Sequence, residues 1–306
     1  MKDKITVIGS LNFDIITKVS HFPVKGETLG AEDAVVAGGG KGANQAVQAA
    51  KLGADVFMVG SVGKDAMGDF LLSSLNKYGV DTSHVRISDK VSGLGMVNST
   101  EDGSVTATLV RGANFTVSRE DVDAAEDLLA ESDIVILQME IPMDTIQYSI
   151  EAAKKAGCRV ILNAAPALPI EEASMMACDL IVVNEVEASF YAGGKVITKD
   201  NVEEQAAAFA NQFGNSWLVT LGGDGSGLYT GGKFRYFSPC KTNVVETTGA
   251  GDSYIGGIAY ALTKGKGLEE ACEFAQGCSA VTISRFGAQD SMPVLEEVER
   301  YNQSQK

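Results

Sequence analysis

Cysteine, histidine and proline are scarce in this chain of 306 residues, and positive charge is in the minority. The five cysteines include no C-x-x-C pair and neither of the two histidines lies near a cysteine, so the sequence predicts free thiols and neither a zinc site nor a disulfide framework. With 25 Lys+Arg against 40 Asp+Glu, the net charge of -15 disfavours binding to nucleic acid or to anionic lipid.

Long apolar runs are also lacking. No window of about 20 residues is apolar enough to span a bilayer. The short apolar run after the first charged residues indicates a strand and not a signal peptide, so the expected location is the cytoplasm.

Glycine, by contrast, is abundant, with 34 residues against 6 prolines. This ratio indicates tight turns and sites lined by backbone, because glycine allows close approach and unusual backbone angles. An apolar fraction of 45% and a charged fraction of 21% are typical of a globular chain. A chain of this length can bury a large core without disulfides or a structural metal.

Strand-like apolar runs alternate with segments of helical periodicity from residue 134 onward. This order predicts βαβ units and an α/β fold with a doubly wound, mainly parallel sheet flanked by helices. The predicted strands cover residues 5–9, 56–62, 134–139, 160–163, 180–184, 217–221, 227–230 and 234–237. The predicted helices cover residues 43–52, 66–78, 145–156, 203–213, 250–263 and 268–284.

Two segments, 13–36 and 92–111, carry alternating patterns without a helix. Residues 92–97 and 105–110 flank Glu101-Asp102-Gly103, a predicted hairpin turn. These segments are too short for a second full domain. We therefore expect a single α/β domain over residues 1–306 with a small β-sheet lid over one edge of the main sheet.

The strongest chemical signal is Thr247-Thr248-Gly249-Ala250-Gly251-Asp252 at the start of a predicted helix. The glycines let successive N–H groups face one ligand, and the helix N-terminus adds partial positive charge, a combination that binds phosphate. It also stabilises charge that develops during phosphoryl transfer. Asp252 in the first turn is placed to accept a proton from an alcohol; the alternative is an acid that only caps the helix.

A second glycine-rich stretch, residues 38–44, runs directly into a predicted helix. It is not a Walker A loop, because Gly42 follows Lys41 where serine or threonine is required. It is not a dinucleotide fingerprint either, because it does not follow the first strand. The stretch indicates that backbone, Lys41 and Asn44 approach a polar ligand; the alternative is a loop that lets the helix pack closely on the sheet.

Six motifs together resemble the ribokinase-type carbohydrate kinases, the PfkB family. They come in the family's order and lie at residues 9–14, 39–46, 138–142, 184–187, 220–225 and 248–252. The resemblance implies an ATP-dependent kinase that transfers the γ-phosphoryl group to the primary hydroxyl of a sugar. The form of residues 39–45 is most similar to family members that act on D-ribose, with ribose 5-phosphate as product.

Other acceptors remain open: 2-deoxyribose, another sugar or a nucleoside. A non-catalytic sugar-binding protein is the alternative from a different class. A dehydrogenase is disfavoured, because residues 5–9 lead into Ser10-Leu11-Asn12-Phe13-Asp14 and not into a glycine-rich loop.

The resemblance also implies roles for individual residues. The expected catalytic groups are Asp252 and the amides of Gly249, Ala250 and Gly251. The expected sugar-binding residues are Asn12, Asp14, Gly40, Lys41, Asn44, Glu140 and Asp252. The expected nucleotide-binding residues are Asn184, Thr220, Leu221, Gly222, Gly223, Asp224, Gly225, Gly251 and Gln276.

Two metal ions are implied in the same way. Glu187 would position Mg²⁺ through water, since this ion prefers oxygen ligands and keeps several waters. A K⁺ site would draw on Glu246, Thr248, Thr282, Arg285, Gly287 and Ser291. Here the chain departs from the family, which has aspartate at the position of Glu246 and often proline at that of Asp290. The resemblance further implies a homodimer formed through the lid.

Overall fold

The computed structural model describes residues 3–101 and 105–305; Asp102 and Gly103 of the predicted hairpin turn lie outside these ranges. Within them, nine strands form the main sheet in the order β13-β12-β11-β10-β9-β8-β1-β4-β5. The strands are β1 (Lys4–Ile8), β4 (Asp55–Gly63), β5 (Val80–Ser88), β8 (Ile134–Gln138), β9 (Arg159–Asn163), β10 (Leu180–Asn184), β11 (Ser216–Thr220), β12 (Ser226–Thr230) and β13 (Lys233–Phe237). Pairing is parallel from β5 to β11, and β12 and β13 add antiparallel strands. The predicted doubly wound, mainly parallel sheet is confirmed.

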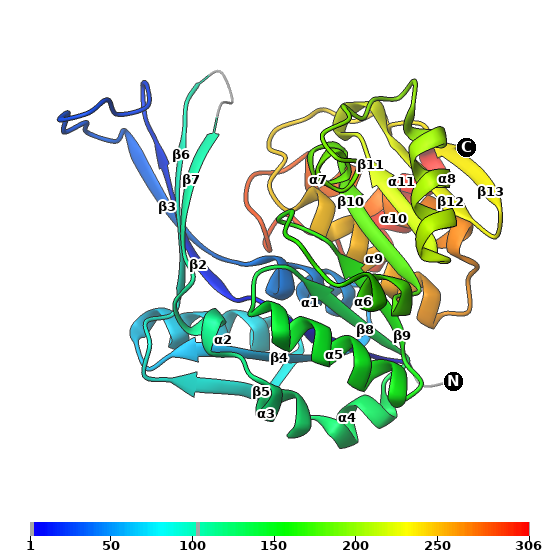
Figure 1. Cartoon of the computed structure of the whole chain (residues 1–306). Helices are drawn as coiled ribbons and strands as arrows, with labels where there is room; N and C mark the ends of the chain where they lie inside the picture. The colour runs from blue at the N-terminus through cyan, green and yellow to red at the C-terminus, as the bar shows by residue number, and fades with distance from the viewer. Residues whose placement is uncertain (1–2, 102–104, 306) are drawn as a thin grey trace.

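Helices cover both faces of this sheet (Figure 1). The longer ones are α1 (Lys41–Lys51), α2 (Ala66–Lys77), α5 (Met143–Lys155), α8 (Val202–Phe213), α9 (Ala250–Thr263), α10 (Leu268–Thr282) and α11 (Leu295–Ser304). The shorter ones are α3 (Arg119–Asp123), α4 (Glu126–Glu131), α6 (Glu172–Ala177) and α7 (Glu185–Tyr191).

The central strand β8 shows why its sequence is continuously apolar. Ile134 and Ile136 pack into a core with α1, α2, α9 and α10, whereas Val135 and Leu137 pack into a second core with α4, α5 and α8. Successive side chains of a strand point to opposite faces, so a strand between two helix layers needs apolar residues at every position.

A second sheet, which we call the lid, packs against α1 and α2 at its base and projects away from the helices at its outer end (Figure 1). Its strands are β2 (Asn12–Lys18), β3 (Asp33–Gly39), β6 (Gly93–Ser99) and β7 (Val105–Val110), in the order β3-β2-β6-β7. The outer pairs are antiparallel, but β2 and β6 run parallel. The predicted small β-sheet is thus confirmed, and β2 and β3 connect it directly to β1 and to α1.

The edge strand β5 was not predicted. It pairs with β4 alone, and most of its side chains are at least partly exposed, so its sequence lacks the apolar run of the central strands. A helix capable of spanning a bilayer is absent from the described part of the chain. All five cysteines are free thiols; Cys240 is half-buried and the other four are buried.

Candidate active site

Four carboxylates and one lysine lie within electrostatic range of one another around the ends of β1, β8 and β10 and the starts of α1 and α9. Asp14 interacts electrostatically with Glu140 and Asp252. Lys41 interacts with Glu140, Asp252 and Glu187. The fold thus brings together residues from positions 14 to 252 of the chain, at the carboxyl ends of parallel strands where such sheets bind ligands.

Asp252 lies in the first turn of α9, and both of its carboxylate oxygens accept hydrogen bonds from side-chain amides. Asn44 Nδ2 donates to Oδ2 and Gln45 Nε2 donates to Oδ1, each at 2.9 Å. These donors cannot take up a proton, so they hold the carboxylate in one orientation and leave it as the local proton acceptor. The motif at 39–46 includes Gln45, but no role was predicted for it. Its hydrogen bond with Asp252 joins residues 207 positions apart in the chain.

Burial raises the pKa of Asp252 above the usual value of an aspartate. The charge of Lys41 and the hydrogen bonds from Asn44 and Gln45 act in the opposite direction. Burial lowers the pKa of Lys41, but Asp252, Glu140 and Glu187 outweigh this effect and raise it. Lys41 therefore stays protonated and balances the buried negative charge.

The start of α9 is open to a ligand. Gly249 caps the helix with a φ of 77°, in the left-handed region that favours glycine. No atom lies within 4 Å of the position that a Cβ on Gly251 would occupy. The Gly249-Ala250-Gly251 backbone can therefore be approached closely by an anion at the N-terminus of a 14-residue helix.

Asp14 is held in a slot between two glycines of the neighbouring strands. A Cβ on Gly39 would lie 1.9 Å from Oδ2 of Asp14, and one on Gly95 would lie 2.2 Å from Oδ1. Burial, together with the charges of Glu140 and Asp252, raises the pKa of Asp14 to about 7. Only glycine at these two positions leaves room for the carboxylate on this face of the lid.

Glu140 follows β8, and one of its oxygens is already occupied. Ser10 Oγ donates to Oε2 at 2.5 Å and the backbone N–H of Lys41 donates to the same oxygen at 3.3 Å. A Cβ on Gly40 would lie within 3.0 Å of backbone atoms of residues 10–12, so α1 starts in direct contact with the end of β1. This close approach is what the glycines before α1 provide.

Asn12 is oriented by Asn114, a residue that the sequence analysis missed. Asn114 lies in the short 3₁₀ helix η1 (Gly112–Thr116) and is buried. Its Nδ2 donates to Asn12 Oδ1 at 2.7 Å and to the carbonyl of Leu11 at 3.1 Å, and its Oδ1 accepts the N–H of Leu11 at 2.9 Å. An isolated asparagine about 100 residues from its partners gave no recognisable signal.

We expect Asn114→Ala to lower the free energy of unfolding by about 2–4 kcal/mol, because it leaves buried polar groups of Leu11 and Asn12 without partners. Urea unfolding measures this loss. The same variant should lose more of its affinity for sugar than of its affinity for ATP. The matched control is Asn201→Ala, which removes two comparable backbone hydrogen bonds of an exposed loop. A control that weakens sugar binding as much as Asn114→Ala would contradict the assignment.

Two of the residues expected at the nucleotide, Asn184 and Thr220, are the last residues of the neighbouring strands β10 and β11. Asn184 and Thr220 are opposite each other in the parallel register. Asn184 Oδ1 caps α7 by accepting the N–H groups of Val186 and Glu187, while Glu187 Oε2 accepts the N–H of Asn184 at 2.7 Å. Oε1 of Glu187 takes no part in this backbone capping, and the side chain of Asn184 also hydrogen-bonds Glu187.

The turn after β11 is also accessible. Leu221 donates its N–H to the carbonyl of Gly225 at 2.8 Å, closing the 3₁₀ turn η2 (Gly222–Asp224). A Cβ on Gly223 would meet no atom within 4 Å, so the turn leaves space above its backbone. Gln276 on α10 donates to the carbonyl of Ser238 at 2.7 Å, in the segment that packs on Gly225.

The residues expected at K⁺ are only partly free to bind it. Glu246 Oε2 accepts the N–H of Gly287 at 2.8 Å, which joins the turn before α9 to the loop after α10. The hydroxyl of Thr282 donates to Ser253, and Arg285 pairs with Glu297. The hydroxyl of Ser291 donates to the carbonyl of Ala288, and Thr248 is exposed. Of the side chains expected at K⁺, only Glu246, through Oε1, and Thr248 therefore offer an oxygen that no hydrogen bond within the described ranges engages.

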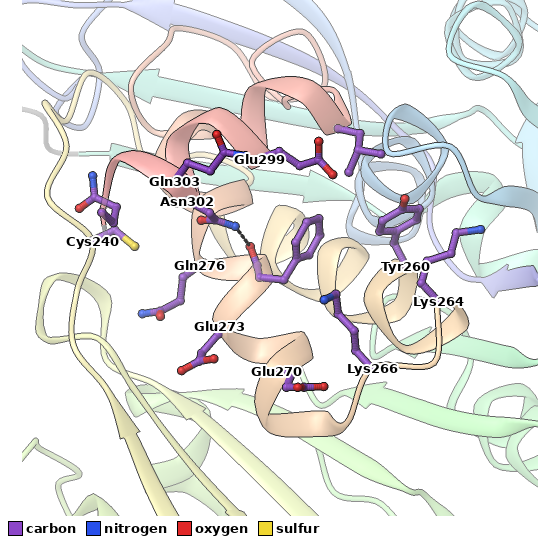
Figure 2. Close-up of a pocket in the computed structure, with 13 residues that line it drawn as sticks. Cys240, Tyr260, Lys264, Lys266, Glu270, Glu273, Gln276, Glu299, Asn302 and Gln303 are labelled. Carbon is purple, nitrogen blue, oxygen red and sulfur yellow. Dashed lines mark hydrogen bonds between the residues drawn. The ribbon is translucent and has the colours of Figure 1, made fainter.

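A cavity of about 780 Å³ lies elsewhere, between the end of α9, α10 and α11 (Figure 2). Of the predicted site residues only Gln276 lines it. Across the described ranges, no group of three His, Cys, Asp or Glu side chains is arranged to hold a metal ion. A divalent ion at Glu187 would therefore depend on ligand oxygens and water for most of its coordination.

Comparison with known proteins identifies relatives over nearly the whole chain. The family model described as pfkB family carbohydrate kinase matches residues 2–295. The ribokinase of Haemophilus influenzae is 33% identical over 298 residues, which is 97% of each protein. The deoxyribokinase of Salmonella typhi is 34% identical over 299 residues, 97% of this chain and 98% of the relative. A solved structure of Arabidopsis thaliana ribokinase complexed with ribose and ATP superposes with a TM-score of 0.88 at 32% identity, over 98% of each chain.

Proposed function

Because the chain belongs to the pfkB family of carbohydrate kinases, we propose that it transfers the γ-phosphoryl group of ATP to the primary hydroxyl of D-ribose. The observation that carries this proposal is the partly buried Asp252 carboxylate, held by two amides beside the glycine-rich start of α9. The hydroxyl gives its proton to Asp252, its oxygen forms the bond to phosphorus, and ADP leaves with the electrons of the broken P–O bond.

The sugar lies against the groups that accept and donate hydrogen bonds around Asp252. Asp14 and the free oxygen of Glu140 accept from sugar hydroxyls, while Asn12, Lys41 and Asn44 donate. A neutral polyol needs both kinds of partner, because each hydroxyl that loses water without a replacement costs binding free energy. The backbone of Gly40 completes the wall next to Lys41.

ATP lies along the ends of β10 and β11, with its transferring phosphate at the N–H groups of Gly249, Ala250 and Gly251. Asn184 contacts the phosphates, and the nucleoside lies along residues 220–225 with Gln276 near the base. Glu187 holds Mg²⁺ through water. When bound, this ion neutralises phosphate charge and orients the phosphate chain.

The lid closes over the sugar and excludes water, so that the hydroxyl and not water receives the phosphate. Among the residues described, the lid exposes Val36 and Met96 on one face and Val35 and Leu109 on the other. Exposed apolar side chains of this kind are typical of an interface, and we propose that two copies associate through the lid. The proposed location of this dimer is the cytoplasm.

The test of the proposed function is ATP consumption measured across a panel of sugars and nucleosides that includes ribose and 2-deoxyribose. Ribose should give the highest kcat/KM. The deoxyribokinase among the relatives makes 2-deoxyribose the second candidate, and a higher kcat/KM with it would replace ribose in the proposal. Consumption with no member of the panel would overturn the kinase assignment.

We also propose that K⁺ activates the enzyme through the turn between Glu246 and α9, and that Glu246→Asp strengthens this response. Glutamate places its oxygen about 1.5 Å farther out than aspartate, one carbon–carbon bond, and such a shift is enough to disturb catalytic geometry. The measurement is kcat with K⁺ replaced by a bulky organic cation at constant ionic strength. If neither the native enzyme nor the variant responds to K⁺, the ion site is wrong.

A further inference from the structure

The buried side chain of Gln289, in the loop between α10 and α11, lies in a chain of hydrogen bonds that ends on Asp252. It is 4% exposed. Its Nε2 donates to Asn44 Oδ1 at 3.2 Å, and Ser74 Oγ on α2 donates to its Oε1 at 3.0 Å. Asn44 Nδ2 in turn donates to Asp252 Oδ2.

This chain determines which way the Asn44 amide faces. An asparagine amide has an oxygen that accepts and an NH₂ group that donates, and either could face the carboxylate of Asp252. Because Gln289 presents its NH₂ group to Asn44 Oδ1, the Asn44 NH₂ group faces Asp252. The reversed amide would place an oxygen against a carboxylate oxygen, which is repulsive and leaves a buried acceptor unpaired.

Packing holds Gln289 in this orientation. Gly38 is the penultimate residue of β3. A Cβ at this position would lie 2.8 Å from Gln289 Oε1 and 3.2 Å from Ser74 Oγ. The lid strand therefore lies directly on the Gln289–Ser74 hydrogen bond. Polar groups enclosed in this way have few alternative partners. Exchanging the two ends of the Gln289 amide would keep a hydrogen bond with the Ser74 hydroxyl, which can donate or accept, but would set Gln289 Oε1 against Asn44 Oδ1 and lose the bond to Asn44.

The other oxygen of Asp252 is held in the same manner. Gln138 Nε2 donates to Gln45 Oε1 at 2.8 Å, and Gln45 Nε2 donates to Asp252 Oδ1. Each carboxylate oxygen thus lies at the end of an amide chain. The chain through Gln289 differs in that it starts in the loop that also donates the Gly287 N–H to Glu246.

We infer that Gln289 is a positioning residue for phosphoryl transfer. It fixes the Asn44 amide so that a hydrogen bond reaches Asp252, and it ties the general base to the geometry of the loop after α10. The inference rests on the proposed function of Asp252 as general base. It concerns a residue that contacts neither reactant and acts through Asn44.

The test is the pH dependence of kcat for Gln289→Met, which keeps the size of the side chain but removes its amide. The Asn44 hydrogen bond lowers the pKa of Asp252, and a general base works only when deprotonated. Loosening this bond should move the acid limb of the profile upward by about 0.5–1 pH unit and lower kcat at pH 7 by about 10-fold. Gln289→Glu, which still accepts from Ser74 but cannot donate to Asn44, should shift the limb the same way.

The matched control is Gln48→Met. Gln48 is a buried glutamine on α1, the helix that carries Asn44, and it hydrogen-bonds the carbonyl of Pro293 and the hydroxyl of Ser253 but not Asp252. It should lower the melting temperature and leave the acid limb in place. In an Asn44→Ala background, Gln289→Met should produce no further shift, because the two act in one chain.

The inference is overturned if neither Gln289 variant moves the acid limb, if Gln48→Met moves it equally, or if the Gln289→Met shift persists in full without Asn44. Failure of the proposed function gives a different result. In that case Asp252→Asn keeps near-native turnover, whatever the Gln289 variants do. Native ATP affinity in each variant shows that the fold around the nucleotide is preserved.

Discussion

Asp252→Asn should lower kcat by on the order of 10²–10⁴ and leave ATP binding nearly unchanged. The variant keeps the size of the side chain but cannot accept the hydroxyl proton, and its NH₂ group would face the donor amide of Asn44 or Gln45. Single-turnover phosphorylation of ribose measures the chemical step, and equilibrium titration measures ATP binding. Since burial raises the pKa of Asp252, native turnover should rise with pH through an elevated pKa.

The control for this result is Asp144→Asn. Asp144 is an exposed acid in the first turn of α5, so it shares the favourable interaction with a helix N-terminus and nothing else. The Asp144→Asn variant should lose about a few tenths of a kcal/mol in free energy of unfolding and keep native activity. Comparable losses of activity in the two variants, or near-native turnover in Asp252→Asn, would mean that Asp252 only caps its helix.

Asp14→Asn should lower kcat/KM for the sugar by roughly 10- to 100-fold, the cost of losing charge-assisted hydrogen bonds. The KM for ATP should change little. Because the pKa of Asp14 is about 7 in the unliganded protein, the sugar KM of the native enzyme should fall as pH rises from 6 to 8. The asparagine variant should lose this dependence, since it has no proton to release.

The same substitution should stabilise the unliganded protein at pH 8. The folded-state pKa of Asp14 lies above its usual value, so the folded state binds the proton more tightly than the unfolded state, and stability falls as pH rises towards 7. Asparagine removes this loss, and the melting temperature at pH 8 should rise. Asp33→Asn, at the exposed far end of the lid, should change neither the sugar KM nor the melting temperature. Equal weakening of sugar and ATP binding by Asp14→Asn would identify Asp14 as a structural residue.

The alternation of strands and helices was predictable because two helix layers demand continuous apolar strands such as β8. The strand β5 was not, since an edge strand with polar side chains resembles a loop in sequence. The place of Asp252 in the first turn of a helix was predictable from its own motif, because a glycine-rich helix start is a local feature. The roles of Asn114 and Gln289 depend on contacts across 102 and 245 residues and on which end of an amide faces inward. No local pattern encodes that choice.

The way the lid joins the main sheet sets how far its parts can travel. Asn12 is paired with both Gly39 and Gly93, so three lid strands meet in one row at the base of the lid. At about 3.3 Å per residue, Asp14 lies roughly 7 Å from this row and Lys18 roughly 20 Å. A tilt of about 10° about the row would carry Lys18 through about 3.5 Å but Asp14 through only about 1 Å. If Asp14 binds the sugar as proposed, a large displacement at the far end of the lid would therefore move this carboxylate only slightly relative to the sugar hydroxyls.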